Sequence, residues 1–376
     1  MTQRKYNIAT ASLCLVGWLL TAPLWGSKPA QEFVRKISRD FAISPNGTTA
    51  IYNKYGNVKV NTWANPSVKM DITIVVNAPD QRTAERTFDR IKVNFLSTAD
   101  YVKAETIIEA DQRTTFLVIG AGTQDYKIHY DVWLPANNQL DLKNRYGDAY
   151  VGNLKGKLTA EIRYGNLRGE NLGGDADLSL SYGKTSFNQV RQLTGSISYS
   201  DLLAERAADV GMDSRYSELR VTQANAVRLT SKYDKLHFGN IGTLRVQTRY
   251  SDLRAQQVGS LFLTAQYTDS RLDRIAELLD ADLSYGQLSV ATLGRHFSEA
   301  RLQGKYTDIK IAVEPGTAFR LDAQGKHTDV RTPSSMSRVA RMEIVDGQVN
   351  VSGFAGESNA PRIITARLQY GDFVLK

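Results

Sequence analysis

A tyrosine-centred repeat constrains the fold of this chain more than any other feature of its sequence. The stretch from Leu244 to Ala255 reads LRVQTRYSDLRA, and similar stretches lie one repeat earlier (VRLTSKYDKLHF) and one repeat later (LFLTAQYTDSRL). Each combines an alternating apolar and polar run, a tyrosine, a short polar turn and a second alternating run. Alternation with a period of two is typical of a strand with one buried face. The repeat therefore predicts strands that turn at each tyrosine.

The repeat continues over most of the chain at nearly constant spacing. From residue 146 to residue 306 the tyrosines are 17 or 18 residues apart, except for a last interval of 21. Tyr55 is an earlier copy, His327 takes the next place, and Asp346-Gly347 is a copy that has lost its aromatic residue. The predicted structural tyrosine ladder consists of Tyr146, Tyr164, Tyr182, Tyr199, Tyr216, Tyr233, Tyr250, Tyr267, Tyr285, Tyr306 and Tyr370.

One repeat is too short to bury a core of its own, so the copies must stack on one another. We therefore predict an all-β fold, a right-handed parallel β-solenoid with coils of about 17–18 residues. The absence of proline between residues 136 and 314 fits strands that donate hydrogen bonds to neighbours on both sides. A hexapeptide coil would need apolar residues six apart, and a calcium-binding roll would need a glycine-rich series, of which Gly173-Gly174-Asp175 is the one match.

The first residues predict export. Arg4 and Lys5 precede an apolar run from Ile8 to Ala22, which is typical of a secretory signal peptide and predicts one at residues 1–26. An uncleaved membrane anchor is the alternative, since the run is near the short end of a spanning helix. Cys14 is the one cysteine and lies in this run, so the mature chain is expected to have no disulfide bond.

Residues 27–135 are predicted to form an N-terminal β segment that caps the open end of the array. The run Val68–Val76 alternates as a strand does, and Asp80 is a suitable N-cap for a helix at about 80–91. The β-solenoid repeats are then expected to occupy residues 136–376, with irregular coils after residue 300.

Charged residues recur at fixed positions around the tyrosines. Two of the 47 basic residues and none of the 39 acidic ones lie in residues 1–26, which leaves a net charge of +6. The position before the tyrosine and the fourth position after it are often basic, while the second position after it is often acidic. The possible ligand-facing basic residues are Arg163, Arg168, Arg215, Arg220, Lys232, Arg249, Arg254, Lys305 and Lys310.

Two interpretations of these basic rows remain open. They could line a groove for an anionic polymer such as lipopolysaccharide or an acidic polysaccharide. Alternatively, they could form a solvated edge on which the interleaved acidic residues pair with them. No catalytic residue, metal site or cofactor is expected, because the four histidines share no ligand or triad spacing. Nucleic-acid binding is not expected either, since basic and aromatic residues do not interleave on the exposed face as such binding requires.

The run NKYGNVKVNTW at residues 53–63, together with the serial Tyr-Gly-Asp and Tyr-Gly-Asn turns, resembles the bacterial putative-adhesin domain family. The resemblance implies an exported β-solenoid in a family of largely unassigned function, with no catalytic residues to transfer. The prediction is a non-catalytic adhesin-like binding or structural protein in the periplasm or on the cell surface of a bacterium, with a cell-surface or polysaccharide ligand. The alternative is a binder or lyase of anionic polysaccharide or lipopolysaccharide that uses the basic rows. Membrane association beyond the signal segment stays open.

Overall fold

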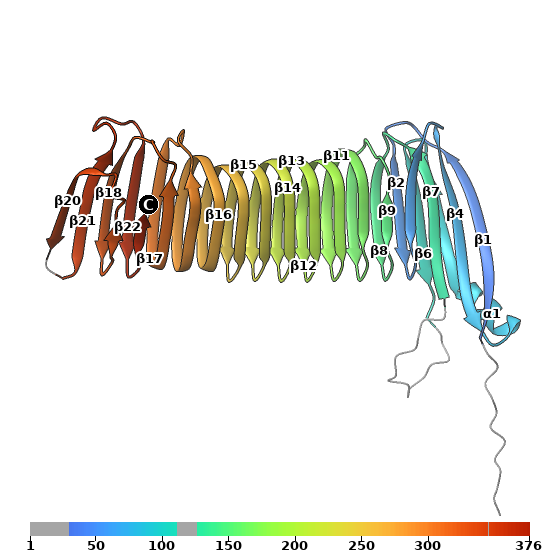
Figure 1. The fold of residues 1–376 in the computed structure, drawn as a ribbon. Helices are drawn as coiled ribbons and strands as arrows, with labels where there is room; N and C mark the ends of the chain where they lie inside the picture. Colours follow the sequence, from blue (N-terminus) through green and yellow to red (C-terminus); the bar gives the residue numbers. More distant parts are fainter. Residues whose placement is uncertain (1–29, 111–125, 345) are drawn as a thin grey trace, which may run out of the picture.

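A computed structural model describes residues 30–110, 126–344 and 346–376 and shows an elongated stack of parallel coils (Figure 1). The predicted all-β solenoid with an N-terminal β-rich cap and one helix is confirmed, and its right-handed winding stays a prediction. The predicted signal peptide lies outside the described residues.

The elements follow one another along the axis in nearly the order of the sequence. The N-terminal elements are β1 (Gln31–Ala42), β2 (Thr48–Lys54), β3 (Val58–Trp63), β4 (Ser67–Ala78), α1 (Gln81–Arg90), β5 (Ile91–Ser97), β6 (Tyr101–Ile108), β7 (Tyr126–Pro135), β8 (Gln139–Arg145) and β9 (Ala149–Val151). The array continues with β10 (Leu158–Arg163), β11 (Leu167–Ser181), β12 (Lys184–Ser198), β13 (Asp201–Arg215), β14 (Glu218–Lys232), β15 (Lys235–Arg249), β16 (Asp252–Leu293) and β17 (Glu299–Val313). The C-terminal elements are β18 (Phe319–Lys326), β19 (Val330–Arg331), β20 (Ser337–Ile344), β21 (Gln348–Ala355), β22 (Ile363–Gln369) and β23 (Phe373–Leu375).

Each regular coil consists of one 15-residue strand that bends in its middle and a two-residue turn that contains the tyrosine. Strand β14 pairs in parallel with β13 on one side and β15 on the other, and the pairing continues across the bend. Alternate side chains of β14 point inward, so Leu219, Val221, Val227 and Leu229 are buried in the core. The period-two pattern thus places one face of every strand in a continuous apolar interior.

The N-terminal coils do not stack in the order of the sequence. Strand β2 lies between β6 and β8, and β3 lies between β7 and β9, so the coil that contains Tyr55 fills the second layer of the stack. Strand β4 pairs antiparallel with β7, and β1 pairs antiparallel with β4. Helix α1 packs beside them with Asp80 as its N-cap and Phe88 buried. The predicted division at residues 135 and 136 stays a prediction, because one sheet joins both parts.

The C-terminal end shows a similar change of order. Strand β22 lies between β17 and β18 and is parallel to both, although β17 and β18 are consecutive in the sequence. Strands β20 and β21 then close the end with antiparallel pairing. The predicted repeat copy at Asp346-Gly347 is wrong, because both residues have positive φ (72° and 70°) and close a hairpin between β20 and β21.

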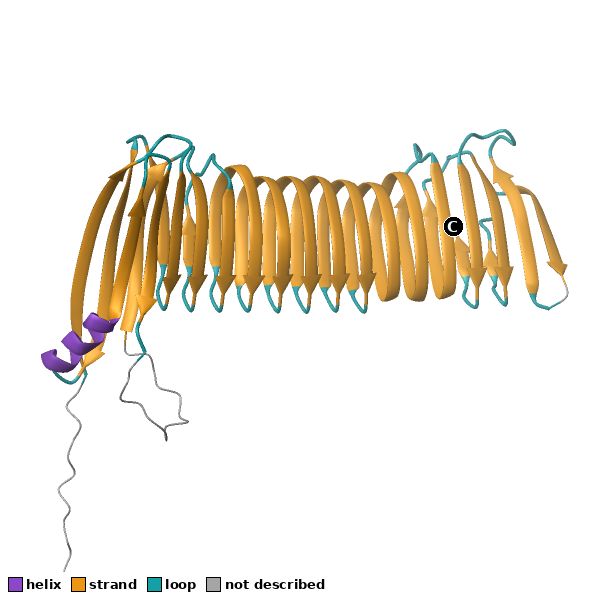
Figure 2. Cartoon of the chain, turned by 180° about the vertical axis from the view of Figure 1, so that it is seen from behind, coloured by secondary structure: helices purple, strands orange, loops and turns teal. Residues whose placement is uncertain are grey.

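The irregular coils after residue 293 contain their extra residues in loops at the bends (Figure 2). These loops span residues 294–298 and 314–318. The Glu314 carboxylate accepts hydrogen bonds from the side chains of Arg274 (2.6 Å) and Arg295 (2.8 Å). These bonds, that of Arg274 first, lower the pKa of the Glu314 carboxyl to about 2. The ion pairs therefore join the two loops to each other and fix the second one to Arg274 in β16.

Removal of residues 363–376 tests the inserted position of β22. Without β22, strands β17 and β18 lose the partner that lies between them, and the buried side chains of Leu302 and Leu321 become exposed. We expect the amides of both strands to lose protection in hydrogen exchange and the midpoint of urea unfolding to fall. If the C-terminal residues formed an ordinary last coil after β18, their removal would leave the amides of β18 protected. Unchanged protection of β18 would therefore contradict the observed strand order.

Candidate functional site

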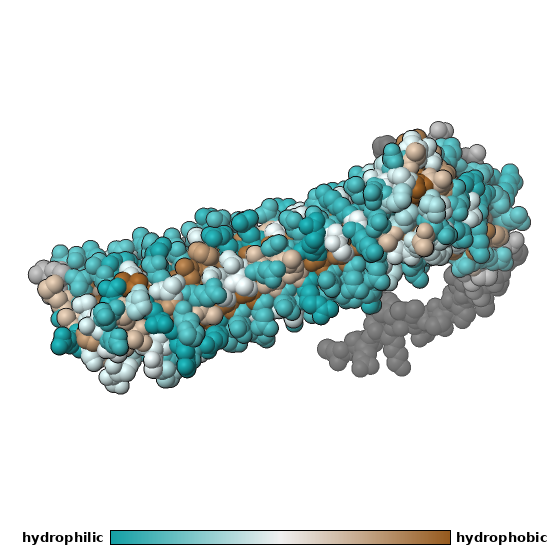
Figure 3. All heavy atoms as spheres, turned by 90° about the horizontal axis from the view of Figure 1, so that it is seen from above, coloured by the Kyte–Doolittle hydropathy of each residue, from teal (hydrophilic) through white to brown (hydrophobic). Residues whose placement is uncertain are grey.

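The edge formed by the tyrosine turns is the distinctive surface of this protein. Seen from above, on the side of the bends, the array is mainly hydrophilic with a narrow apolar line (Figure 3). Among the described residues, the exposed large hydrophobic side chains away from the two ends of the solenoid belong to the tyrosines, which are 39–49% exposed. The turn edge therefore presents an aromatic strip along the whole array.

All eleven tyrosines of the predicted ladder lie in one stack together with Tyr55 and His327. Successive Tyr–Tyr ring centroids are 4.7–5.1 Å apart with interplanar angles of 3–11°. Tyr370 stacks between Tyr306 and His327, which follows from the position of β22. Parallel rings at this separation are offset-stacked, the favourable arrangement for aromatic pairs.

Every rung of this stack has a left-handed backbone. The φ angles of its twelve tyrosines lie between 51° and 62°, and that of His327 is 54°. This conformation costs a residue with a Cβ atom about 1–2 kcal/mol. Each internal ring stacks on two neighbours, and each aromatic pair contributes about 0.5–1.5 kcal/mol. Stacking is therefore large enough to hold tyrosine at a position where glycine or asparagine would be expected.

The residue after the tyrosine is either glycine or a small residue with a side-chain oxygen. In some coils it is glycine, because a Cβ atom at Gly147 would lie 2.0 Å from the carbonyl oxygen of Gly56 in the preceding coil. In others it is Ser, Thr or Asp, whose side-chain oxygen accepts the backbone N–H of the equivalent residue one coil earlier. Ser217 Oγ accepts from Ser200 N (3.2 Å), and Asp234 Oδ1 accepts from Ser217 N (2.7 Å). In both cases the turn packs against the turn of the preceding coil without a bulky side chain at this position.

The nine predicted basic residues lie on two different sides of the tyrosine turn. The pre-tyrosine row comprises Arg163, Arg215, Lys232, Arg249 and Lys305, and the post-tyrosine row comprises Arg168, Arg220, Arg254 and Lys310. Because the chain reverses at the tyrosine, the two rows lie on opposite faces of the flattened coil. The structure therefore separates what the sequence presented as one basic edge.

Carboxylates neutralise most of the post-tyrosine row. Arg220 pairs with Glu218 (3.0 Å), and Arg254 pairs with Asp252 (3.0 Å). Arg168 pairs with a different carboxylate, that of Glu170, at 3.1 Å. For Lys310, no carboxylate within 4.0 Å is found in the described part of the chain. This face is mainly the solvated edge that one of the two interpretations described.

The pre-tyrosine row is different. Arg163 pairs with Glu161 at 2.9 Å. The side-chain cations of Arg215, Lys232 and Arg249, by contrast, have no carboxylate within 4.0 Å among the described residues, and all three residues are exposed. They stand on consecutive coils in direct register, since Lys232 is opposite Arg215 in β13 and Arg249 in β15. We call these three residues the cation triplet. Lys305, further along the same row, also lacks a carboxylate partner among these residues.

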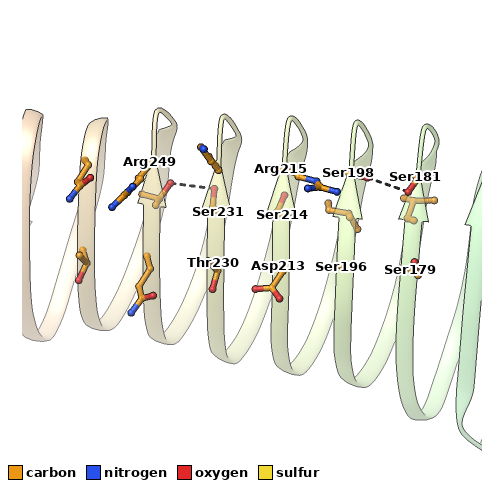
Figure 4. Close-up of a pocket in the computed structure, with 17 residues that line it drawn as sticks. Ser179, Ser181, Ser196, Ser198, Asp213, Ser214, Arg215, Thr230, Ser231 and Arg249 are labelled. Atoms are coloured by element: carbon orange, nitrogen blue, oxygen red, sulfur yellow. Dashed lines mark hydrogen bonds between the residues drawn. The ribbon is translucent and has the colours of Figure 1, made fainter.

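The cation triplet lies in an open groove of about 890 Å³ that crosses six coils (Figure 4). The groove is also lined by hydroxyl and amide side chains, which the sequence analysis missed. A signal for them was present, since serine or threonine recurs one and three positions before the tyrosines. Besides the buried Ser214, Ser231 and Thr248, these polar lining residues are Ser179, Ser181, Ser196, Ser198, Thr230, Gln247, Thr264 and Gln266, with Asp213 as the one acidic residue of the lining. We call this surface the cation groove.

A buried carboxylate lies behind the cation groove. Asp234 is 3% exposed and accepts hydrogen bonds from Ser231 Oγ (2.7 Å), Ser217 N (2.7 Å) and Lys232 N (3.1 Å). The neighbouring inward positions hold Ser231 and Thr248 rather than the usual large apolar residues. Burial is the main cause that raises the pKa of the Asp234 carboxyl above its ordinary value, and the hydrogen bonds oppose that shift.

The ring faces of the tyrosine stack are not available to a ligand. Each internal ring is covered on both faces by its neighbours, so a sugar or a base can reach only ring edges and hydroxyl groups. Cations do lie beside the rings, since Lys232 Nζ is 5.2 Å from the ring centroid of Tyr233 and Lys305 Nζ is 5.9 Å from that of Tyr306. The sequence-based statement that basic and aromatic residues do not interleave is therefore wrong. Base stacking, on which single-strand nucleic-acid binding depends, is still blocked by the covered faces.

Neither metal-binding nor membrane-spanning features stand out in the described ranges. Within residues 30–110, 126–344 and 346–376, no three His, Cys, Asp or Glu side chains are grouped as metal ligands would be. Over the same ranges, no helix has the length and apolar character needed to span a membrane. His327 belongs to the ring stack, and His129 Nδ1 accepts the backbone N–H of Asn57 at 3.3 Å.

Comparisons with known proteins give distant similarity. No protein-family model and no curated protein sequence matches the chain. A putative cell adhesion protein from Clostridium sporogenes is 8% identical over 92% of this chain and 99% of its own, with a TM-score of 0.19. A putative adhesin from Bacteroides fragilis is 12% identical over 91% and 97%, with a TM-score of 0.20. A putative lipid binding protein from Parabacteroides distasonis is 11% identical over 74% and 93%, with a TM-score of 0.23. Two of these names match the family that the sequence resembles, and scores this low support no functional argument.

Replacement of Asp234 by serine tests the cost of its burial. Serine occupies the same position in the turns of Tyr199, Tyr216 and Tyr250, so the variant should fold. An acid whose pKa is raised by folding ionises first in the unfolded state, so it lowers the free energy of unfolding as the pH rises from the unfolded pKa to the folded one. We therefore expect D234S to gain stability relative to the wild type between pH 3.5 and pH 7 in urea unfolding. A difference in the free energy of unfolding between D234S and the wild type that stays constant with pH would contradict this expectation.

Proposed function

We propose that this chain is an exported, non-catalytic, adhesin-like binding protein whose ligand-binding surface is the cation groove. Its ligand is an anionic polysaccharide, either free or as part of lipopolysaccharide, in the periplasm or on the cell surface. The observation that carries the proposal is the difference between the two basic rows. Arg220 and Arg254 have their own carboxylates, whereas the cation triplet has none among the described residues.

The chemistry of the cation groove suits such a ligand. Three exposed cations on consecutive coils repel one another, and an anionic ligand would remove that repulsion. The surrounding hydroxyl and amide groups can donate to and accept from sugar hydroxyl groups. Export, proposed from residues 1–26, would place this surface where polysaccharides of the cell envelope occur.

A binding role without catalysis fits the same surface better than hydrolysis does. Glycoside hydrolysis usually needs two carboxyl groups on either side of the bond that breaks. The lining of the cation groove contains one carboxylate, Asp213, and otherwise repeats similar polar residues from coil to coil. The even distribution favours a surface that holds a polymer over one that reacts at a single point.

A pair of triple variants tests this function. Protein that begins at residue 27 is titrated with polygalacturonate, lipopolysaccharide and neutral dextran, and binding is measured by calorimetry. R215S/K232S/R249S removes the cation triplet, and R168S/R220S/R254S removes the same number of paired cations from the opposite face as a control. Serine is native to both positions at Ser198 and Ser186, so both variants should fold.

We expect the first variant to lose affinity for the acidic ligands by about 100-fold, at roughly fivefold for each exposed charge contact. The control variant should stay within about twofold of the wild type. Failure of the wild type to bind either acidic ligand, or equal losses in both variants, would disprove the proposal. Shortening of the polymer during incubation would favour the lyase alternative.

A further inference from the structure

We infer that the ligand lies parallel to the solenoid axis and places one anionic group on each coil of the cation triplet. This inference rests on the proposed function and adds the direction and the charge spacing of the ligand. Parallel pairing puts Arg215, Lys232 and Arg249 directly opposite one another, so the three cations form a line along the axis. Ser198 precedes this line and Gln266 follows it in the same register. The binding line is therefore three coils long.

A ligand that crossed the coils could not use these charges together. Within one coil, the cation has a tyrosine on one side and Asp213, Thr230 or Gln247 two residues away on the other. None of these neighbours is positively charged. Only a ligand along the axis meets more than one member of the cation triplet.

The spacing of the coils selects the charge spacing of the ligand. Neighbouring strands of a sheet are about 4.8 Å apart, and the ring centroids of Tyr216, Tyr233 and Tyr250 are separated by 4.9 Å at each step. A pyranose residue in an extended chain is comparable in length to one such step. A polymer that presents a carboxylate to the protein at every residue would therefore contact all three cations, whereas one that presents a carboxylate at alternate residues would contact Arg215 and Arg249 and pass over Lys232.

The backbone that carries the line of charges is fixed before any ligand arrives. The cations immediately precede the stacked tyrosines, and the backbone on both sides is paired to the neighbouring coils. Little free energy is then needed to order the protein backbone when the ligand binds. A polymer with the matching charge spacing therefore binds more tightly than one with a different spacing. Because the backbone is fixed, the protein can distinguish polymers by the spacing of their charges.

Single substitutions separate this inference from the proposed function. The probes are polygalacturonate, with a carboxylate on every residue, hyaluronan, with one on alternate residues, galacturonic acid and single-stranded DNA. The variants are K232S, R249S and S198R, and S186R on the opposite face is the matched control for an added charge. Affinity and its salt dependence are measured for each combination.

K232S should lower the affinity for polygalacturonate about fivefold and leave that for hyaluronan nearly unchanged, whereas R249S should weaken both. S198R should extend the line to four coils, raise the affinity for polygalacturonate about fivefold and steepen its salt dependence by about one charge, and S186R should not. Galacturonic acid should bind far more weakly than the polymer, because it meets one cation at a time.

The outcomes against the inference are distinct from those against the proposed function. If both polymers bind but K232S and R249S have the same effect on each, or S198R equals S186R, the axial register is wrong and the proposed function stands. If neither of these polymers nor lipopolysaccharide binds, the proposed function fails as well. Tighter binding of single-stranded DNA than of either polysaccharide would overturn both.

Discussion

The left-handed backbone of the tyrosine in every turn is the constraint on which the rest of the structure depends. It reverses the chain within two residues, which allows a coil of about 17 residues to close on a thin apolar core. The conformation is unfavourable for any residue with a side chain, and the stack of rings offsets that cost. Because each ring needs the ring of the next coil, the coils are bound to stay in register along the whole array.

This register also determines what the surface can do. Each position of the repeat becomes a line along the axis, so a cation at one position becomes a row of cations. Residues two and four positions after the tyrosine share a face of the same strand, which is why Glu218 reaches Arg220. The position before the tyrosine lies across the turn from those carboxylates. Arg163 at this position still pairs with Glu161, two residues before it, but Lys232 and Arg249 follow Thr230 and Gln247 instead. The side-chain cations of the triplet therefore have no carboxylate partner among the described residues.

Much of the fold was predictable, because a period of two and a recurring tyrosine are local signals. The order of the coils was not. Tyr370 has the same turn as Tyr306 and the same inward pattern before it, so nothing in the repeat itself says that β22 inserts before β18. Asp346-Gly347 has the glycine of a tyrosine turn, yet its two positive φ angles form a hairpin. The basic rows were found from position alone, but their placement on two faces, one mostly paired with carboxylates and one mostly not, required knowing where the chain reverses.

The free energy of unfolding of variants at Tyr199 tests the central role of the stack most directly. The residue before Tyr199 is Ser198 and not a cation, so the variants change the stacking without disturbing a neighbouring charge. The ring of Tyr199 stacks on those of Tyr182 (5.0 Å) and Tyr216 (4.9 Å). Phenylalanine keeps the stacked ring and should match the stability of the wild type. Glycine removes the ring, but it adopts the left-handed backbone without strain. Alanine removes the ring and still pays the cost of the left-handed backbone. We expect alanine to be the least stable, by about 1–3 kcal/mol, with glycine between. A glycine variant more stable than the wild type would show that the rings do not offset the strain and would contradict this account.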